Sequence, residues 1–307
     1  MANINNQLSF IVENALNNKE ALIEKSETRY RNIIENIAEK INNDSSKKIV
    51  MLAGPSGSGK TTTANKIKEK LESYGHKAYT VSLDDFYRNI GEGPKHEDGT
   101  YDFECVESLD TDLIHKCLGE LITSSRSELP LFDFMTGRRK EEKNVITLQK
   151  DDVIIVEGLH ALNPVITDTL PQENLLKIYI SVSSRIYDGE KIVLNKRNLR
   201  FIRRMVRDFQ FRNSSVENTY SLWPKVMNGE DKYLFPFKKN ADVIVNSIHI
   251  YEPCAFKTQA IELLSGVEKS SGNYQDAQKL IASLEKFPAI EKNLVPHDSL
   301  LREFLGR

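Results

Sequence analysis

Hydrophobic positions along the chain follow two patterns, one typical of helices and one typical of buried strands. Over residues 6–42, apolar side chains recur every three or four residues, which predicts helix with a break at Asn17-Asn18. After the polar stretch 42–46, short apolar runs alternate with longer helical patterns. The predicted strands are 49–53, 78–83, 153–156, 175–182 and 242–245, with helices at about 60–74 and 108–123. This alternation indicates an α/β fold with a doubly wound parallel sheet flanked by helices.

Two further stretches add to this core. Residues 130–134 and 145–148 read as strands that pair in a β-hairpin insertion around residues 136–139. After about residue 255 the pattern is helical again, with a Ser/Gly break at 270–272. We therefore expect a helical N-terminal extension (1–46), a central α/β domain (47–255) and a helical C-terminal extension (256–307).

The composition is that of a soluble globular protein, with 39% apolar and 28% charged residues. The formal net charge of −2 argues against a nucleic-acid partner or an anionic membrane surface. The sequence also lacks an apolar run of the roughly 20 residues needed to cross a bilayer, and its first residues do not resemble a secretory signal. The three cysteines lie far apart, at positions 105, 117 and 254. We therefore expect a reducing compartment, the cytoplasm.

A glycine-rich segment follows the first predicted strand and precedes a predicted helix. Residues 54–61, Gly-Pro-Ser-Gly-Ser-Gly-Lys-Thr, fit the P-loop pattern G-x-x-x-x-G-K-[ST] at every defined position. In such a loop, backbone N–H groups surround phosphate oxygens, Lys60 reaches the β- and γ-phosphates, and the Thr61 hydroxyl binds Mg²⁺. The predicted nucleotide-binding residues are Gly54, Ser56, Gly57, Ser58, Gly59, Lys60, Thr61 and Thr62. The segment therefore predicts ATP and Mg²⁺ as cofactors.

Acidic residues follow two of the predicted strands. Asp84-Asp85 comes after the strand 78–83, and Glu157 comes after the strand 153–156. Ligands of open parallel sheets bind beyond the carboxyl ends of the strands, so these residues should lie near the phosphate loop. Asp84 is the candidate that orients an acceptor hydroxyl and accepts its proton, and Glu157 is placed to hold Mg²⁺ through water. The alternatives are a helix N-cap for Asp84 or Asp85 and a solvated strand end for Glu157.

Arginines recur at steps of three and four between residues 190 and 213, so on a helix they share one face. These arginines are Arg197, Arg200, Arg204 and Arg207, and the residues expected on the opposite, apolar face are Leu199, Ile202, Val206 and Phe209. Several guanidinium groups on an amphipathic helix suit a lid that closes over a triphosphate and the transferred phosphoryl group. The alternative is the solvated face of an ordinary surface helix.

Seven short segments occur in a fixed order over about residues 48–255. They are Gly-Pro-Ser-Gly-Ser-Gly-Lys-Thr-Thr (54–62), Leu-Asp-Asp-Phe-Tyr (83–87), Tyr-Asp-Phe-Glu (101–104), Pro-Leu-Phe-Asp-Phe (130–134), Val-Glu-Gly (156–158), Arg-Arg-Met-Val-Arg-Asp (203–208) and Lys-Asn-Ala-Asp-Val-Ile (239–244). In this order they resemble the motifs of the uridine kinase and phosphoribulokinase family of P-loop kinases. The chain also resembles a uridine kinase-like branch of that family, whose members often carry an N-terminal TGS/threonyl-tRNA-synthetase-like region. The segments that carry this second resemblance are Leu-Phe-Asp-Phe-Met-Thr-Gly-Arg-Arg (131–139), Trp223-Pro224, Phe235-Pro236-Phe237 and the final Ser-Leu-Leu-Arg-Glu-Phe-Leu-Gly (299–306).

The resemblance implies roles for individual residues. The catalytic residues that it implies are Asp84, Lys60, Arg204 and Arg207. The substrate contacts that it implies are Asp84, Tyr87, Glu104, Phe132, Arg139, Arg204 and Arg212. Four positions depart from the family pattern. Phe132 stands where uridine kinases usually place a tyrosine, and Gly137 stands where they use a histidine. Leu222 and Ser214 replace a glutamine and an arginine that also contact substrate in the family. The groups that transfer the phosphoryl group are thus retained, whereas those that read the base differ.

These observations predict an ATP- and Mg²⁺-dependent kinase that acts on the 5′-hydroxyl of a nucleoside. A kinase for another small alcohol or a sugar phosphate is the alternative in the same class. From a different class, the chain could be an ATP-binding regulatory module without chemistry, although Lys60, Thr61, Asp84 and Glu157 are all present. The N-terminal helices fit two roles equally, namely contact with a second copy in a homo-oligomer or cover for one face of the sheet.

Overall fold

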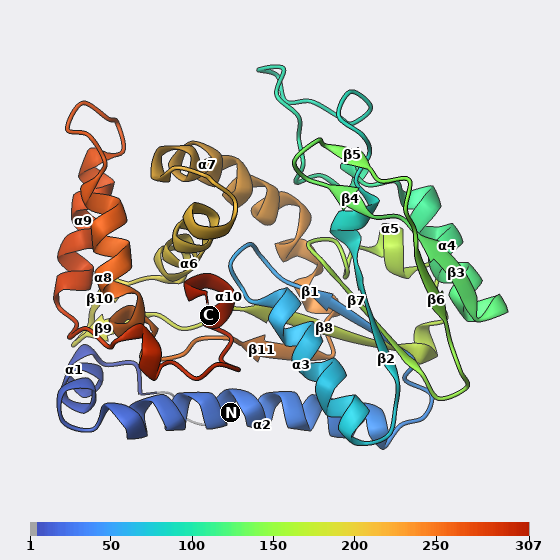
Figure 1. The fold of residues 1–307 in the computed structure, drawn as a ribbon, viewed down its shortest axis with the longest axis horizontal. Helices are drawn as coiled ribbons and strands as arrows, with labels where there is room; N and C mark the ends of the chain where they lie inside the picture. Colours follow the sequence, from blue (N-terminus) through green and yellow to red (C-terminus); the bar gives the residue numbers. More distant parts are fainter. Residues whose placement is uncertain (1–4, 307) are drawn as a thin grey trace.

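The computed structural model describes residues 5–306 and is built around a five-stranded sheet. The strand order is β11-β8-β1-β7-β2, and every neighbouring pair is parallel. The strands are β1 (Ile49–Ala53), β2 (Ala78–Ser82), β7 (Val153–Gly158), β8 (Leu175–Ser181) and β11 (Val243–Asn246). Helices lie on both sides of this sheet (Figure 1), which confirms the predicted doubly wound α/β fold.

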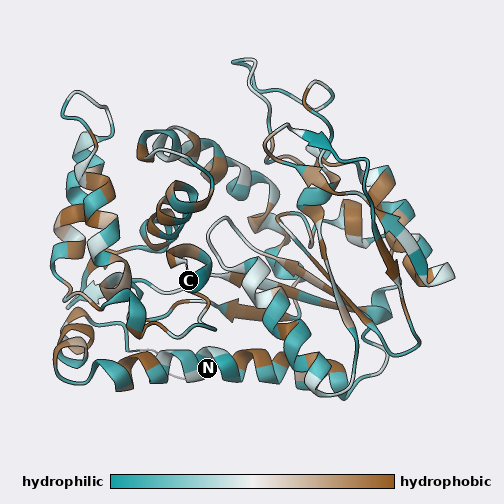
Figure 2. Cartoon of the chain, viewed as in Figure 1, coloured by the Kyte–Doolittle hydropathy of each residue, from teal (hydrophilic) through white to brown (hydrophobic). Residues whose placement is uncertain are grey.

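Successive side chains of the central strands point into two different cores. In β1, Val50 and Leu52 belong to the larger core, whereas Ile49 and Met51 belong to the smaller one. Residues of α3 (Lys60–Ser73) and α6 (Lys196–Phe211) join the larger core, and those of α4 (Thr111–Ser124) and α5 (Pro164–Thr167) join the smaller one. Because both faces are covered, β1 and β7 are buried along their whole length. Figure 2 shows apolar residues, in brown, gathered along these strands.

The N-terminal extension forms two helices, α1 (Leu8–Asn17) and α2 (Lys19–Asn42), separated at Asn18 as predicted. The long α2 runs beneath α3 and packs against it (Figure 1), and it contributes apolar side chains to the larger core. Within this contact the hydroxyls of Tyr30 and Thr63 are 2.7 Å apart, and Tyr30 is fully buried. Within the single chain, α2 therefore covers this side of the sheet.

The predicted hairpin insertion is present, but its pairing differs from the prediction. β3 (Arg126–Leu129) pairs with β6 (Asn144–Thr147), and the short β4 (Phe132–Asp133) pairs with β5 (Arg138–Arg139). The expected pairing of 130–134 with 145–148 was therefore wrong. Pro130 has no N–H to donate and separates β3 from β4, so two short ladders replace one long ladder. Gly137, at φ +65°, lies in the turn that closes the inner ladder.

The arginine-rich helix is α6, and it begins at Lys196, one residue before the first arginine of the pattern. A small hairpin of β9 (Ile186–Asp188) and β10 (Lys191–Leu194) precedes it, and Asn195 caps its first turn. Of the predicted apolar face, three residues are buried, but Phe209 is 51% exposed and does not join the core. α7 (Val216–Tyr233) follows and is packed against α6 through Trp223, which lies 5.5 Å from the Phe201 ring.

The C-terminal extension comprises α8 (Glu252–Ser265), α9 (Tyr274–Glu285) and the short α10 (Arg302–Leu305). The predicted break at 270–272 lies in the loop between α8 and α9. α10 brings the end of the chain back to the phosphate-loop side of α6 and α3 (Figure 1). Within residues 5–306, the helices are all too short or too polar to cross a membrane.

Candidate active site

The turn between β1 and α3 is a phosphate loop that α6 braces from behind. Gly57 and Gly59 have φ values of +74° and +89°, which favour glycine. Arg203 donates from Nη1 to the carbonyl of Gly57 (3.2 Å), and Arg200 donates from Nη1 to the carbonyl of Ser56 (3.0 Å). These bonds fix the loop through its carbonyl oxygens. The first N–H groups of α3 are the donors that a helix start offers to an anion.

A cavity of about 430 Å³ opens beside this loop, beyond the carboxyl ends of β1, β2 and β7. It brings together most of the predicted site residues. Those that line it are Ser56, Gly57, Ser58, Gly59, Lys60, Thr61, Asp84, Tyr87, Glu104, Phe132, Glu157, Arg204, Arg207 and Arg212. Gly54, Thr62 and Arg139 are not among the lining residues. Gly54 instead packs on β8, where a Cβ would lie 2.3 Å from the Ile180 carbonyl oxygen.

Arg139 lies in the hairpin insertion and is fully engaged there. Its guanidinium donates to the Asp110 carboxylate (3.0 Å) and to the carbonyls of Phe86 (3.1 Å) and Tyr87 (3.0 Å). These bonds tie β5 to the segment that follows β2. The structure therefore places Arg139 where it positions Tyr87 rather than where it would touch a substrate in the cavity.

Glu157 is the next-to-last residue of β7 and lines the cavity next to the phosphate loop. Its Oε1 accepts hydrogen bonds from the hydroxyls of Thr61 (3.1 Å) and Ser82 (3.3 Å). Only 7% of the residue is exposed, so it is not a solvated strand end. Burial is the main cause that raises the pKa of this carboxyl to about 7, against the opposing effect of Lys60. A nearby cation would stabilise the ionised form of this buried carboxyl.

The two aspartates after β2 have different surroundings. Asp85 accepts a hydrogen bond from the Phe132 N–H (3.1 Å) and so connects this turn to β4. Burial raises the pKa of the Asp85 carboxyl. Asp84 takes part in the turn through its backbone, because its N–H donates to Ser82 Oγ (3.3 Å), which makes Ser82 the capping residue. The Asp84 side chain lines the cavity.

Glu104 enters the cavity from the loop that precedes α4. Its Cβ is packed so closely on α7 that a Cβ at Gly229 would lie 2.3 Å from it. Burial is the first cause that raises the pKa of Glu104 to about 7, and the nearby Arg204 opposes this effect. Near neutral pH this group can therefore either donate or accept a hydrogen bond to a hydroxyl-bearing ligand.

The arginines of the predicted face lie in two different surroundings, and only Arg204 and Arg207 of the four line the cavity. Arg204, Arg207 and Arg212 line the cavity around Asp208, whose carboxylate contacts them at 3.2, 2.7 and 3.5 Å. Arg204 also donates to the Ser56 hydroxyl (3.0 Å).

The other two members of the predicted face serve different purposes. Arg200 is buried in a bidentate pair with Glu230 (2.6 and 2.7 Å) and braces the loop. Arg197 pairs with Asp231 at the surface (2.7 Å). The expectation that all four arginines share a face turned toward phosphates was therefore wrong for Arg197 and Arg200. Acidic residues on α7 attract both, and nothing in the arginine spacing revealed them.

The far wall of the cavity is aromatic. The ring of Phe132 lies 5.7 Å from Tyr87 and 5.2 Å from Phe134, and Tyr87 lies 5.8 Å from Phe103. The Tyr87 hydroxyl donates to the Phe103 carbonyl (2.9 Å), and this bond keeps the hydroxyl within the wall. Ile90 covers Gly137, since a Cβ there would meet the isoleucine side chain at 2.1 Å. This wall offers ring faces and apolar edges to an acceptor.

Sequence reasoning missed several residues that line the cavity: Ile90, Phe103, Phe134, Leu159 and Glu303. The first four lie close in sequence to residues that were singled out. Glu303 comes from the distant C-terminal extension, and its carboxylate accepts a hydrogen bond from the Thr62 hydroxyl (2.6 Å). The 299–306 motif marks the segment in the sequence, but no catalytic pattern there indicates a site residue.

The chain fits a polyphosphate with Mg²⁺. The hydroxyl of Ser58, inside the loop, is buried and has no hydrogen-bond partner among the described residues. Thr61 and Glu157 supply the hydroxyl and carboxylate that would hold the metal. Within residues 5–306 no cluster of three or more histidine, cysteine or acidic side chains could bind a metal without other ligands. Protein sites usually bind Mg²⁺ through one or two carboxylates together with phosphates and water, and Glu157 supplies such a carboxylate.

Comparison with known proteins identifies relatives of this region. A family model described as "Phosphoribulokinase / Uridine kinase family" matches residues 49–252, from β1 to the first residue of α8. A uridine kinase of Bacillus pumilus is 30% identical over 198 residues, which cover 64% of this chain and 85% of the relative. A uridine kinase of Staphylococcus haemolyticus is 31% identical over 64% of this chain and 86% of its own. A structure described as a "Possible Uridine Kinase" from Bacillus stearothermophilus is 19% identical, with a TM-score of 0.47 over 71% of this chain and 99% of that chain.

Proposed function

Because the chain belongs to the phosphoribulokinase / uridine kinase family of ATP-dependent kinases, we propose that it transfers the γ-phosphoryl group of ATP to the 5′-hydroxyl of a nucleoside. The relatives described as uridine kinases support a nucleoside acceptor. The observation that carries the proposal is that Asp84 lines the same cavity as the phosphate loop. An aromatic wall on the opposite side suits a planar base.

In the proposed reaction, the acceptor hydroxyl oxygen forms a bond to the γ-phosphorus. The bond from that phosphorus to the bridging oxygen breaks, and ADP leaves with the electron pair. Asp84 orients the hydroxyl and accepts its proton. Lys60, Arg204 and Arg207 stabilise the charge on the transferring phosphoryl oxygens. Thr61 and Glu157 would hold Mg²⁺, which offsets the charge of the phosphates when bound.

The acceptor would lie between Asp84 and the aromatic wall. Glu104 is placed to bond its sugar hydroxyls, while Tyr87 and Phe132 pack against its base. Arg212, which lines the cavity with a side chain that is 60% exposed, would close over the bound substrates. Arg139 contributes indirectly, by positioning Tyr87.

The test is ADP release from ATP and Mg²⁺ with uridine, cytidine, thymidine, purine nucleosides and several sugar phosphates. Turnover with a nucleoside that Asp84→Asn abolishes supports the proposal. ATP binding without turnover on the whole panel would instead favour a regulatory module. Asp85→Asn is the matched control, because it changes the neighbouring carboxylate that bonds the Phe132 N–H.

A kinase for another small alcohol or sugar phosphate is the second candidate, and one observation favours it. The aromatic wall presents no free polar group at Gly137 to read a pyrimidine edge. Three arginines at the opposite side of the cavity could bind an acceptor that carries its own phosphate. Turnover restricted to the sugar phosphates of the same panel would establish this alternative.

We further propose that residues 47–255 form the kinase domain, with extensions at 1–46 and 256–307. The family match to 49–252 supports these limits. A cytoplasmic location suits the three cysteines, which are free and buried.

A further inference from the structure

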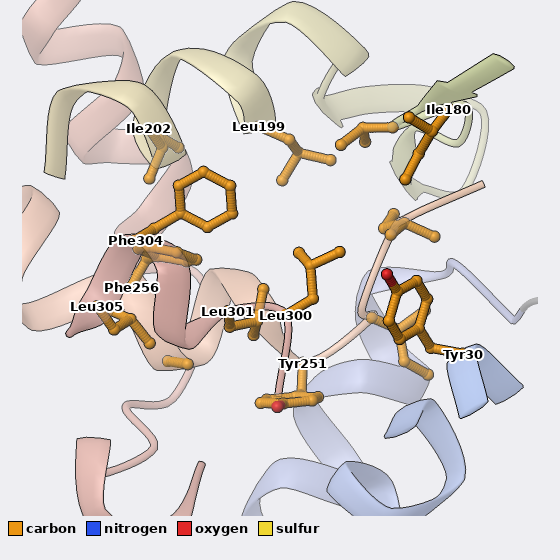
Figure 3. Packing of buried hydrophobic residues seen from close by; sticks show 14 of the residues in the cluster. Tyr30, Ile180, Leu199, Ile202, Tyr251, Phe256, Leu300, Leu301, Phe304 and Leu305 are labelled. Carbon is orange, nitrogen blue, oxygen red and sulfur yellow. The ribbon is translucent and has the colours of Figure 1, made fainter. Parts of the chain in front are cut away.

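The C-terminal segment from Pro296 to Gly306 packs directly against the phosphate loop. Leu300 covers Gly59 so closely that a Cβ on the glycine would lie 2.5 Å from Leu300 Cδ1. Figure 3 shows Leu300 and Leu301 within the core, and Phe304 beside Ile202 and Phe256. This segment lies outside the residues that match the family, 49–252. The wall that it forms is therefore a property of this chain's extension.

The segment is firmly anchored. Leu300, Leu301 and Phe304 are fully buried. The Arg302 guanidinium donates to the backbone carbonyls of Lys292, Val295, Pro296 and Gly306. The Ser299 hydroxyl donates to the Glu27 carboxylate on α2 (2.6 Å). A segment held by this many buried contacts is a fixed wall rather than a tail that leaves its place easily.

Glu303 is the one charged side chain of this wall that lines the cavity among the described residues. Its Oε2 accepts a hydrogen bond from the Thr62 hydroxyl (2.6 Å), in the first turn of α3. The backbone N–H groups of that first turn are the groups that phosphate oxygens bind at the start of a helix. A polyphosphate on the loop would therefore lie next to a carboxylate whose position is fixed.

The Glu303 carboxylate adds to the negative charge of the cavity. Asp84, Glu157 and Glu303 share the cavity with Lys60. The negative charges of Asp84 and Glu303 both contribute to the raised pKa of Glu157. A metal-free nucleotide adds several further negative charges to this partly desolvated space, where like charges repel more strongly than in water. A nucleotide with bound Mg²⁺ adds fewer.

We propose that Glu303 belongs to the phosphate-donor site and makes it select the magnesium-bound nucleotide over the metal-free one. The inference rests on the proposed kinase function, since it assumes that the loop binds a nucleotide. It assigns a specificity role to a residue beyond the family region. Glu303 acts on the donor by charge and takes no part in bond formation.

The test is the affinity for ADP with Mg²⁺ and with EDTA, measured by isothermal titration calorimetry. Glu303→Gln removes the charge and keeps an oxygen for the Thr62 hydroxyl. We expect metal-free ADP to bind about tenfold more tightly to this variant, with the affinity for MgADP unchanged within about threefold. Asp298→Asn is the matched control, because it removes one charge from the same segment at an exposed carboxylate that pairs with Lys66 outside the cavity. We expect it to leave both affinities unchanged.

A preference for MgADP that is equal in wild type and Glu303→Gln would overturn this inference alone. So would weaker binding of both forms by the variant, since that would make Glu303 an ordinary ligand contact. A wild-type chain that binds neither form overturns the proposed function together with the inference. Circular dichroism checks that the variant is folded, and Glu303→Ala, which removes the same charge, provides the second test of the same expectation.

Discussion

The two ends of the cavity are built in different ways. At the phosphate end, the loop is braced by buried ion pairs, with Arg200 bound to Glu230 and Arg203 bound to Glu252. At the acceptor end, rings from a hairpin and a loop pack against one another edge to face or tilted, and Phe134 is 66% exposed. The first end is fixed by charge and backbone contacts within the core, whereas the second is held by side-chain packing near the surface.

This difference has a consequence for function. Phosphates are similar in every donor, so a fixed set of N–H groups and cations suits them all. An acceptor is recognised by its shape and by the hydrogen bonds at its edges, and small changes in a wall change that recognition. Phe132 and Gly137 lie at the acceptor end, where this chain departs from the family pattern. We therefore expect variants at the phosphate end to change kcat and variants at the aromatic wall to change the acceptor KM.

The largest effect is expected at the phosphate end, from Lys60→Ala. The ammonium group is the cation that the P-loop places on the β- and γ-phosphates, so its loss should lower kcat by about 10³-fold. Steady-state ADP release measures the effect, and thermal unfolding should show a folded variant. Lys66→Ala is the control, because Lys66 lies on the same helix but pairs with Asp298 and does not line the cavity. Normal turnover by Lys60→Ala would contradict the phosphate-loop assignment.

Asp84→Asn should have the next largest effect. The amide keeps the size of the side chain but cannot accept the hydroxyl proton, so kcat should fall by about 10²-fold or more. The KM for ATP should change little. Asp85→Asn should keep kcat within about threefold, because the Asp85 carboxylate bonds the Phe132 N–H instead. If kcat survives intact in Asp84→Asn, that residue has only a structural role in the turn.

The phosphate end was also the more predictable of the two. The loop motif and the two strand-end acids specified Lys60, Thr61, Asp84 and Glu157 as neighbours, because parallel strands bring their carboxyl ends to one edge. The central strands β1 and β7 followed from short apolar runs, since a strand buried on both faces needs no polar positions. These features depend on local sequence and on general rules of the fold.

The features that the sequence did not predict depend on residues that are distant from one another in the sequence. Arg200 has the same spacing as Arg204, yet Glu230 on another helix holds it in the core. Pro130 divides the hairpin into two ladders. Short strands specify their pairing register only weakly, so the sequence pattern did not reveal this division. Glu303 reached the cavity through the packing of the C-terminal segment, which no local pattern describes. Predicting such contacts requires the tertiary arrangement itself.

A smaller effect, on stability, should come from the buried carboxyl of Glu157, whose pKa burial raises to about 7 from 4.5. Between these values the folded chain keeps a proton that the unfolded chain has lost, so the free energy of unfolding falls as the pH rises through this window. The loss should be on the order of 2 kcal/mol between pH 5 and pH 8. Urea unfolding at both pH values measures it. Glu157→Gln should reduce the measured loss by about this amount, and the part that remains includes the contribution of Glu104, whose pKa burial also raises to about 7. Glu69→Gln, a change at an exposed residue on α3, should leave the loss unchanged.

The smallest effect is expected at the aromatic wall, from Phe132→Ala. Removing the ring takes away a stacking surface for the acceptor and opens space next to Tyr87, so the acceptor KM should rise about tenfold. The KM for ATP should stay within about twofold, because the phosphate end is braced independently of this wall. Initial rates with each substrate varied in turn separate the two constants, and Phe209→Ala, an exposed ring outside the cavity, is the control. An equal rise in both KM values would mean that the two ends of the cavity are coupled and that the contrast between them is structural only.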